Sequence, residues 1–327
     1  MERRAALLVR ALGRGVRGGE LDPGVTLVAV VGATATGKTE LGVRLALALG
    51  GEVVNADSMQ LYRGMDIGTA KASEEERQGV PHHVLDLWPV TEPADVARYR
   101  TAARAAVAEI EARGRTPVLV GGSGLYVRAV LDDLELPGTD PEVRRALEAE
   151  LAEVGPAALH ARLATRDPAA AAAILPSNGR RLVRALEVVE LTGSFRAQLP
   201  EPRYLRPTVQ LGVRRERSVL DERIAARVDR MWERGLVDEV ERLVGEGLAE
   251  GPTASRALGY AQVLRALEGA TTLDAAREET VRATRRFARR QESWFGRDPR
   301  VRWVDGGDAA GLDALVAELA ASPSTSR

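Results

Sequence analysis

The chain has 327 residues, of which 28% are charged and 45% hydrophobic, and its formal net charge is −1. This length allows a large core plus a smaller unit, and the balanced charge excludes a polycation, although local basic patches remain open. The absence of cysteine excludes disulfides, a thiol nucleophile and a cysteine zinc finger, and the presence of only three histidines argues against a zinc site. No apolar stretch reaches the roughly 20 residues of a membrane span. We expect a cytoplasmic protein.

The first half of the chain alternates between strand-like and helical patterns. Residues 1–24 are typical of a basic tail, and residues 25–139 carry the alternation. Such a rhythm predicts an α/β fold with a doubly wound parallel sheet. The expected strands cover residues 26–31, 52–56, 83–86 and 117–120, with a helix over 95–113.

The pattern changes near residue 140. Residues 140–200 are rich in Ala, Arg and Leu at helical spacing, which predicts a small all-helical insertion. The core is expected to resume over 201–312, and residues 313–327 form a helix end and a tail. Within this second part of the core we expect strands at 208–213 and 301–304 and two long helices at 219–246 and 273–294.

A phosphate-binding loop follows the first predicted strand. Only two of the 46 basic residues are lysines, and one of them, Lys38, completes the pattern G-x-x-x-x-G-K-S/T. In such a loop, backbone N–H groups bind phosphate oxygens, the ammonium neutralises a diphosphate, and the final hydroxyl, here Thr39, holds Mg²⁺. The expected diphosphate-binding residues are Gly32, Ala33, Thr34, Ala35, Thr36, Gly37, Lys38 and Thr39.

Two features common in nucleoside triphosphatases are missing. The strand at 117–120 ends in Gly121, Gly122 and Ser123 rather than in a carboxylate that helps to hold Mg²⁺. Neither lysine follows an asparagine, so the chain has no Asn-Lys-x-Asp guanine reader. Hydrolysis of a nucleoside triphosphate is therefore not the favoured function.

Residues after the second predicted strand are candidates for the chemistry. Ligands bind outside the carboxyl ends of parallel strands, so Asp57 is expected over the phosphate loop. Its carboxylate is suited to accept a proton or to coordinate Mg²⁺ indirectly, and equally suited to cap a helix N-terminus. The sequence leaves both roles open. The amide of Gln60 offers a donor and an acceptor to the edge of a base.

Arginines gather in two groups. One group lies on one face of a predicted helix, and its members are Arg223, Arg227, Arg230 and Arg234. This face is either solvated surface or a source of a guanidinium that reaches the diphosphate. The other group, with three arginines of the insertion, provides basic surfaces suited to a phosphodiester backbone. Its members are Arg282, Arg285, Arg286, Arg289 and Arg290, with Arg180, Arg181 and Arg184 of the insertion.

Together these motifs resemble the tRNA dimethylallyltransferase (isopentenyltransferase) family, in its bacterial type. The resemblance covers about residues 26 to 304, and the run from Asp57 to Lys71 is far more specific than a phosphate loop alone. The matching stretches are residues 32–39, 55–71, 81–83, 120–126, 184–188, 258–260 and 284–291, followed by Trp294 and Phe295.

The resemblance implies prenyl transfer from dimethylallyl diphosphate, with Mg²⁺, to the exocyclic amine of an adenosine beside the anticodon of tRNA. Asp57 matches the family's general base, Arg227 the arginine near the diphosphate, and Ser123 a hydroxyl position usually held by threonine. We expect a monomer that grips the anticodon arm. The residues implied to contact tRNA are Asp57, Ser58, Met59, Gln60, Ser123, Arg144, Arg180, Arg181, Arg184, Arg256, Gly259 and Tyr260.

The chain departs from the family pattern at three places. Asn178 and Gly179 stand where Asn-Asp is usual, Arg289 replaces a lysine, and Ser123 replaces threonine. The first puts details of tRNA contact in doubt, whereas the other two keep a charge or a hydroxyl. An alternative function is transfer to a free nucleotide, as an adenylate prenyltransferase or nucleotide kinase, but such an enzyme needs neither the insertion nor the late arginine helix. A non-catalytic RNA-binding protein is a third hypothesis and has no use for Asp57.

Overall fold

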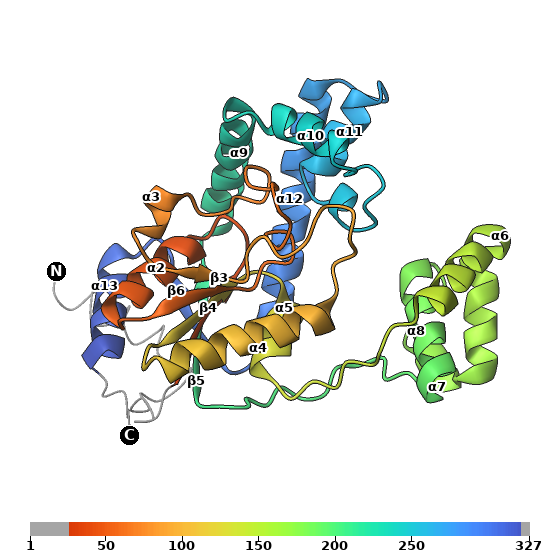
Figure 1. The fold of residues 1–327 in the computed structure, drawn as a ribbon, viewed down its shortest axis with the longest axis horizontal. Helices are drawn as coiled ribbons and strands as arrows, with labels where there is room; N and C mark the ends of the chain where they lie inside the picture. The colour runs from red at the N-terminus through yellow and green to blue at the C-terminus, as the bar shows by residue number, and fades with distance from the viewer. Residues whose placement is uncertain (1–25, 322–327) are drawn as a thin grey trace, which may run out of the picture. The chain divides into compact units, whose positions relative to one another are not determined.

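A six-stranded parallel sheet forms the centre of the protein. The computed structural model describes residues 26–321, so the tail expected at 1–24 and residues 322–327 lie outside the described part. The strand order is β3-β2-β4-β1-β5-β6 (Figure 1), which confirms the predicted α/β fold. The strands are β1 (Leu27–Gly32), β2 (Glu52–Asn55), β3 (His82–His83), β4 (Pro117–Gly121), β5 (Thr208–Arg214) and β6 (Val301–Asp305).

The chain divides into two compact units. One runs to Asp132 and resumes at Tyr204, while Asp133–Arg203 form the other, which includes the insertion expected at 140–200. The sheet belongs to the first unit. The helices of this unit are α2 (Lys38–Ala48), α3 (Glu74–Arg77), α4 (Val96–Ala112), α5 (Gly124–Leu131), α9 (Arg217–Glu233), α10 (Leu236–Gly245), α11 (Tyr260–Leu267), α12 (Leu273–Phe295) and α13 (Ala309–Ala321), with a 3₁₀ turn at Ala254–Arg256.

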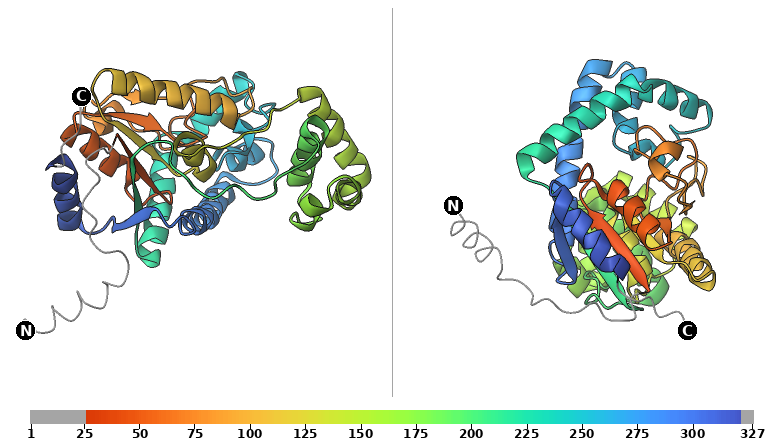
Figure 2. Two further views of the ribbon diagram at one scale, coloured as in Figure 1. Left: turned by 90° about the horizontal axis from the view of Figure 1, so that it is seen from below. Right: turned by 90° about the vertical axis from the view of Figure 1, so that its left-hand side faces the viewer.

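Helices cover both faces of the sheet (Figures 1 and 2). Val28 and Val30 of β1 pack with Leu41 of α2 and Leu315 of α13 on one face. The alternate side chains of β1 pack on the other face with α4, α5, α10 and α11. Every residue of β1, β2 and β4 is buried, which explains why β1 and β4 read as continuous apolar runs, whereas β2 has Glu52 and Asn55 at its ends.

The registers of β1, β2 and β4 bring their carboxyl ends to one edge of the sheet. Val31 of β1 pairs with Gly121 of β4, and Asn55 of β2 pairs with Val120 of β4. The segments that follow these three strands therefore start side by side. This is the edge at which parallel α/β sheets bind ligands.

The insertion has its own hydrophobic core. Its helices are α6 (Pro141–Arg166), α7 (Pro168–Ala172) and α8 (Gly179–Thr192). Leu147, Leu159 and Leu163 of α6 pack against Leu182 and Leu186 of α8 in this core. A bend at residue 155, where φ is 78°, interrupts α6 just before a proline. No helix within residues 26–321 has both the length and the apolar character needed to cross a membrane.

Two expected elements differ from the structure. The helix expected over 219–246 is divided into α9 and α10, because Gly235 adopts a left-handed φ of 91° between them. The strand expected over 83–86 is only β3, His82–His83, because Val84 and Asp86 have φ angles of 63° and 56° and leave the extended conformation. The helices expected at 95–113 and 273–294 are present as α4 and α12.

Candidate functional site: a phosphate loop beside a buried carboxylate

The segment between β1 and α2 folds around one of its own carbonyl groups. The Thr36 hydroxyl and the Lys38 ammonium both donate to the carbonyl oxygen of Ala33, at 2.9 and 2.5 Å. Gly37, with φ of 107°, turns the chain immediately before Lys38, the first residue of α2. A tight loop that leads into a helix N-terminus presents N–H groups and a positive dipole end to an anion. The predicted phosphate loop thus has the geometry that its chemistry requires.

Two arginines of α9 reach this loop. The Arg227 guanidinium donates to the Thr34 hydroxyl at 3.1 Å, and Arg223 Nε donates to the carbonyl oxygen of Ala35 at 2.9 Å. Arg223 and Arg227 therefore contact the phosphate loop, although Arg223 is also exposed, as are Arg230 and Arg234. The stripe is neither wholly solvated surface nor wholly a binding site.

The cations at the loop repel one another. Burial and the nearby Arg227 lower the pKa of Lys38 to about 7, and the Asp57 carboxylate partly opposes this shift. Burial also lowers the pKa of Arg227, and the charges of Arg223 and Arg230 lower it further. A bound anion would relieve this repulsion, because opposite charge favours the protonated form of each group. The electrostatics of the loop therefore favour an anion, as its backbone conformation does.

Asp57 follows β2 and lies close enough to this cluster to interact with it electrostatically. Its carboxylate accepts the Met59 backbone N–H at 3.0 Å, and its own N–H donates to the Asn55 side chain at 2.9 Å. No helix begins here, so the helix-cap role that the sequence left open does not apply. Burial raises the pKa of Asp57, opposed by the Met59 N–H and by the charges of Lys38 and Arg227. A raised pKa makes the carboxylate a stronger base.

Ser123 joins the turn after β4 to the Asp57 turn. The Ser58 backbone N–H donates to Ser123 Oγ at 3.1 Å, and Ser123 Oγ donates to Ser58 Oγ at 3.2 Å. The Ser123 N–H donates to the carbonyl oxygen of Ala56 at 3.2 Å. Ser123 is therefore hydrogen-bonded to both chain neighbours of Asp57, Ala56 and Ser58, whereas the sequence connects Ser123 with Asp57 only through the family resemblance.

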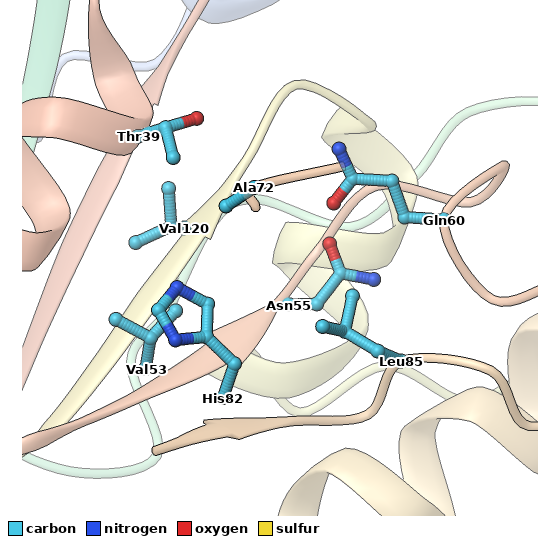
Figure 3. A pocket seen from close by; sticks show the side chains of 8 residues that line it. All are labelled: Thr39, Val53, Asn55, Gln60, Ala72, His82, Leu85 and Val120. Carbon is cyan, nitrogen blue, oxygen red and sulfur yellow. The ribbon is translucent and has the colours of Figure 1, made fainter. Parts of the chain in front are cut away.

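The Gln60 amide is fixed by two backbone groups. Its Nε2 donates to the carbonyl oxygens of Thr69 and Ala70, at 3.1 and 3.3 Å. Met59, in contrast, packs against the hydrophobic core. Gln60 also lines a small pocket beside α2 (Figure 3); the lining residues are Thr39, Val53, Asn55, Gln60, Ala72, His82, Leu85 and Val120. Of the predicted run from Asp57 to Gln60, Met59 packs into the core, and the Gln60 side chain is held by backbone groups beside the pocket.

The second lysine has a structural role. Lys71 is buried, and its ammonium contacts Asp66 at 2.5 Å, Asp86 at 2.6 Å and the carbonyl oxygen of Tyr62 at 3.1 Å. These partners satisfy its three N–H groups. The rarity of lysine in this chain thus marks two positions, of which only Lys38 lies on the phosphate loop.

Glu239 of α10 anchors the loop that leads to Lys71, a role that the sequence analysis did not identify. Its carboxylate accepts backbone N–H groups from Asp66, Ile67 and Gly68, with the shortest distance 2.9 Å, and also the Tyr260 hydroxyl at 2.5 Å. The contacts span more than 170 residues of sequence, so no local pattern could reveal them. Its burial on α10, which the structure shows, is the one signal that points to this role of Glu239.

Tyr260 is one of the predicted tRNA contacts, but its side chain is fully buried. Its ring fills the space beside Gly68, and its hydroxyl donates to Glu239. It therefore supports the loop at 66–68 and does not present its side chain to a ligand in this structure. Gly259, with φ of 88°, precedes α11, and Arg256 is exposed in the 3₁₀ turn.

The predicted tRNA-binding arginines of the insertion fall into two pairs. Arg144 and Arg184 both contact the buried Glu187 carboxylate, at 2.5 and 2.7 Å, and are partly exposed. Arg180 and Arg181 are exposed at the start of α8. Glu187 neutralises part of the first pair and fixes its position, so this pair is ordered by the insertion itself.

Comparisons with known proteins identify the family. The sequence model described as IPP transferase matches residues 60–298. The chain belongs to this family. A protein of Kineococcus radiotolerans named tRNA dimethylallyltransferase is 66% identical over 308 residues, covering 91% of this chain and 97% of its own. One of the same name from Streptomyces coelicolor is 64% identical, covering 93% and 98%. The chain is of the bacterial type.

Solved structures give the same result. The tRNA isopentenylpyrophosphate transferase of Bacillus halodurans is 42% identical, with a TM-score of 0.68, and the match covers 91% of this chain and 96% of that one. A eukaryotic dimethylallyltransferase described as acting on tRNA is 25% identical, with a TM-score of 0.74, and the match covers 90% and 77%. The family and the fold expected from the sequence motifs are therefore confirmed.

Proposed function

We propose that this chain transfers a dimethylallyl group from dimethylallyl diphosphate to the exocyclic amine of an adenosine next to the anticodon of tRNA, releasing diphosphate. Family membership supports prenyl transfer to tRNA over transfer to a free nucleotide. The observation that supports the mechanism is the position of the partly buried Asp57 carboxylate within electrostatic reach of Lys38 and Arg227 at the phosphate loop. A base and a diphosphate site are thereby adjacent.

The phosphate loop binds and stabilises the leaving group. As the bond between the allylic carbon and the diphosphate oxygen breaks, negative charge grows on the diphosphate. Lys38, Arg227 and the loop N–H groups are placed to stabilise that charge, and stabilisation of developing charge is usually the largest catalytic term. Protonated Lys38 is needed for this role, and binding of the anion itself favours its protonation.

Asp57 receives the proton of the nucleophile. The adenine amine forms the new bond to the allylic carbon and loses one proton, which the Asp57 carboxylate accepts. Because an aromatic amine is a weak nucleophile, holding it against the allylic carbon supplies much of the rate. Ser123 lies beside Asp57 through Ser58 and is placed to contact the incoming base.

The Thr39 hydroxyl fits a magnesium ion. It is exposed at the start of α2, and Mg²⁺ at phosphate sites takes few protein ligands and fills its shell with phosphate oxygens and water. Mg²⁺ held there would neutralise part of the diphosphate charge. One chain carries all of these groups, so we further propose that it acts as a monomer, in the cytoplasm where tRNA is modified.

A series of anticodon stem-loop RNAs tests this function. With dimethylallyl diphosphate and Mg²⁺, the protein should prenylate a stem-loop with adenosine beside the anticodon. It should not prenylate a stem-loop with inosine there, because inosine lacks the amine. Equal transfer to both RNAs would contradict the proposed nucleophile. Transfer to AMP or ATP but not to the stem-loop would favour the free-nucleotide alternative.

A further inference from the structure

A single buried amide connects α12 to two of the loops at the site. Gln291 is 5% exposed. Its Oε1 accepts the Thr34 backbone N–H of the phosphate loop at 2.9 Å, and its Nε2 donates to the carbonyl oxygen of Gly122 at 2.9 Å. The segments after β1 and β4 are therefore both hydrogen-bonded to the same side chain, which lies more than 160 residues away in sequence from either.

Two glycines permit this close approach of α12. A Cβ at Gly122 would lie 2.3 Å from Gln291 Nε2, and a Cβ at Gly124 would lie 2.0 Å from Trp294 Nε1. Real Cβ atoms do not come so close to other heavy atoms, so a Cβ at either position would displace the facing side chain of α12. Ser123, between these glycines, is thus held against α12 by contacts on both sides.

Each bond of Gln291 continues into the proposed chemistry. Thr34, which donates its N–H to Gln291, accepts Arg227 at its hydroxyl. Gly122 precedes Ser123, whose hydroxyl contacts Ser58, the residue after Asp57. One amide therefore sets the spacing between the diphosphate side of the site and the side that carries the base.

The same part of α12 also borders an exposed, basic groove. An open groove there is lined by Arg289, Arg290, Ser293, Trp294 and Arg297. Arginine and an exposed indole suit a nucleic acid backbone and its bases. α12 therefore carries both the exposed basic groove and the buried Gln291 side chain. It connects a surface suited to RNA with the loops that hold the reacting groups.

We propose that Gln291 is a positioning residue for prenyl transfer, which holds the phosphate loop and the Ser123 turn in register with α12. It acts through Thr34 and Gly122 and does not contact RNA, because its side chain is buried and its amide is engaged at both ends. The inference rests on the proposed function for its rate effect. Its effect on diphosphate binding is independent of that function.

Two substitutions at Gln291 separate its two bonds. Gln291→Met keeps an unbranched side chain of similar length and removes both hydrogen bonds. Gln291→Glu keeps an acceptor for Thr34 but replaces the donor to Gly122 with a second acceptor. The matched controls are Arg289→Gln and Arg290→Gln, which change exposed residues of the same turns. Circular dichroism and melting temperature establish that each variant is folded.

Binding of inorganic pyrophosphate with Mg²⁺, measured by calorimetry without RNA, is the first readout. We expect Gln291→Met to weaken it by about tenfold and Gln291→Glu to weaken it less, while both arginine variants bind it within about twofold of the wild type. In steady-state prenylation of tRNA, Gln291→Met should lower kcat by about 10–100-fold, the range expected for a small misplacement, with little change in the KM for tRNA. Arg289→Gln and Arg290→Gln should raise the KM for tRNA and leave kcat unchanged.

The opposite pattern would overturn the inference. Unchanged pyrophosphate binding in both Gln291 variants, with a raised KM for tRNA, would mean that Gln291 contacts RNA directly. If Gln291→Met is unfolded, pyrophosphate binding and steady-state prenylation of Gln291→Glu test the inference instead. Gln291→Glu loses the hydrogen bond to Gly122, so its kcat should fall. Wild-type protein that binds pyrophosphate but never prenylates tRNA would refute the proposed function and leave the binding effect of Gln291 standing.

Discussion

Replacement of Glu239 by glutamine tests whether one carboxylate fixes the loop at 66–71. The carboxylate has two oxygens, which together accept three backbone N–H groups and the Tyr260 hydroxyl. Glutamine offers one acceptor oxygen and places an NH₂ group where the other oxygen was. If that oxygen stays on Tyr260, the NH₂ faces the N–H groups of Asp66 and Ile67, so donors meet donors in a buried site.

The magnitude follows from the lost bonds. A hydrogen bond to a charged group is worth about 1.5–3 kcal/mol, and losing two of them predicts a destabilisation of about 3 kcal/mol or more. The matched control is Tyr260→Phe, which removes one donor and leaves the carboxylate with its backbone partners, at a cost of about 1.5 kcal/mol. Burial and the Glu239 carboxylate raise the pKa of Tyr260, so its hydroxyl remains a donor across the working pH range.

Urea unfolding followed by circular dichroism measures both variants. Because the loop also supplies the two carbonyl groups that hold Gln60, Glu239→Gln should in addition raise the KM for tRNA. The reasoning is refuted if Glu239→Gln unfolds within about 0.5 kcal/mol of the wild type, which is the scale of an ordinary surface substitution. It is also refuted if Tyr260→Phe is the more destabilising of the two.

Three further predictions concern the site itself. Asp57→Asn should lower kcat by about 10²–10⁴-fold, as expected for loss of a general base, and should retain pyrophosphate binding. Single-turnover assays measure the rate, and a loss below about fivefold would contradict the role of Asp57 as the base. Because Lys38 binds the anion when protonated and its pKa is lowered to about 7, affinity for an alkyl diphosphate should fall as pH rises above that value. Calorimetry should show that this decline is absent in Lys38→Arg. Gly124→Ala should displace Trp294 and lower stability, and Trp294→Ala should restore much of it in the double variant.

Local patterns were enough to predict the sheet and the phosphate loop. β1 and β4 are buried on both faces and read as apolar runs, β2 is recognised by Val53 and Val54 at its centre, and the loop is defined by glycines and a lysine within eight residues. The edge of the sheet to which Asp57 belongs followed from the rule for parallel strands. These features depend on near neighbours in the sequence.

The features that sequence analysis missed depend on distant neighbours. Glu239 and Gln291 act on loops more than 160 residues away, and no spacing rule connects them with those loops. The expected helix at 219–246 is divided because Gly235 adopts a left-handed conformation. A glycine within a helical pattern either stays helical or ends the helix, and the pattern alone does not decide which. Tyr260 was expected to contact tRNA, but packing beside Gly68 buries it.

The identity of the acceptor tests the central claim most directly. Purified protein is given labelled dimethylallyl diphosphate and Mg²⁺ with unmodified tRNA, AMP and ATP in separate reactions, and the labelled nucleoside is identified after digestion. The account predicts label only in tRNA, on the amine of the adenosine beside the anticodon, and its loss in Asp57→Asn. Label in AMP or ATP, or consumption of ATP without any transfer, would contradict it.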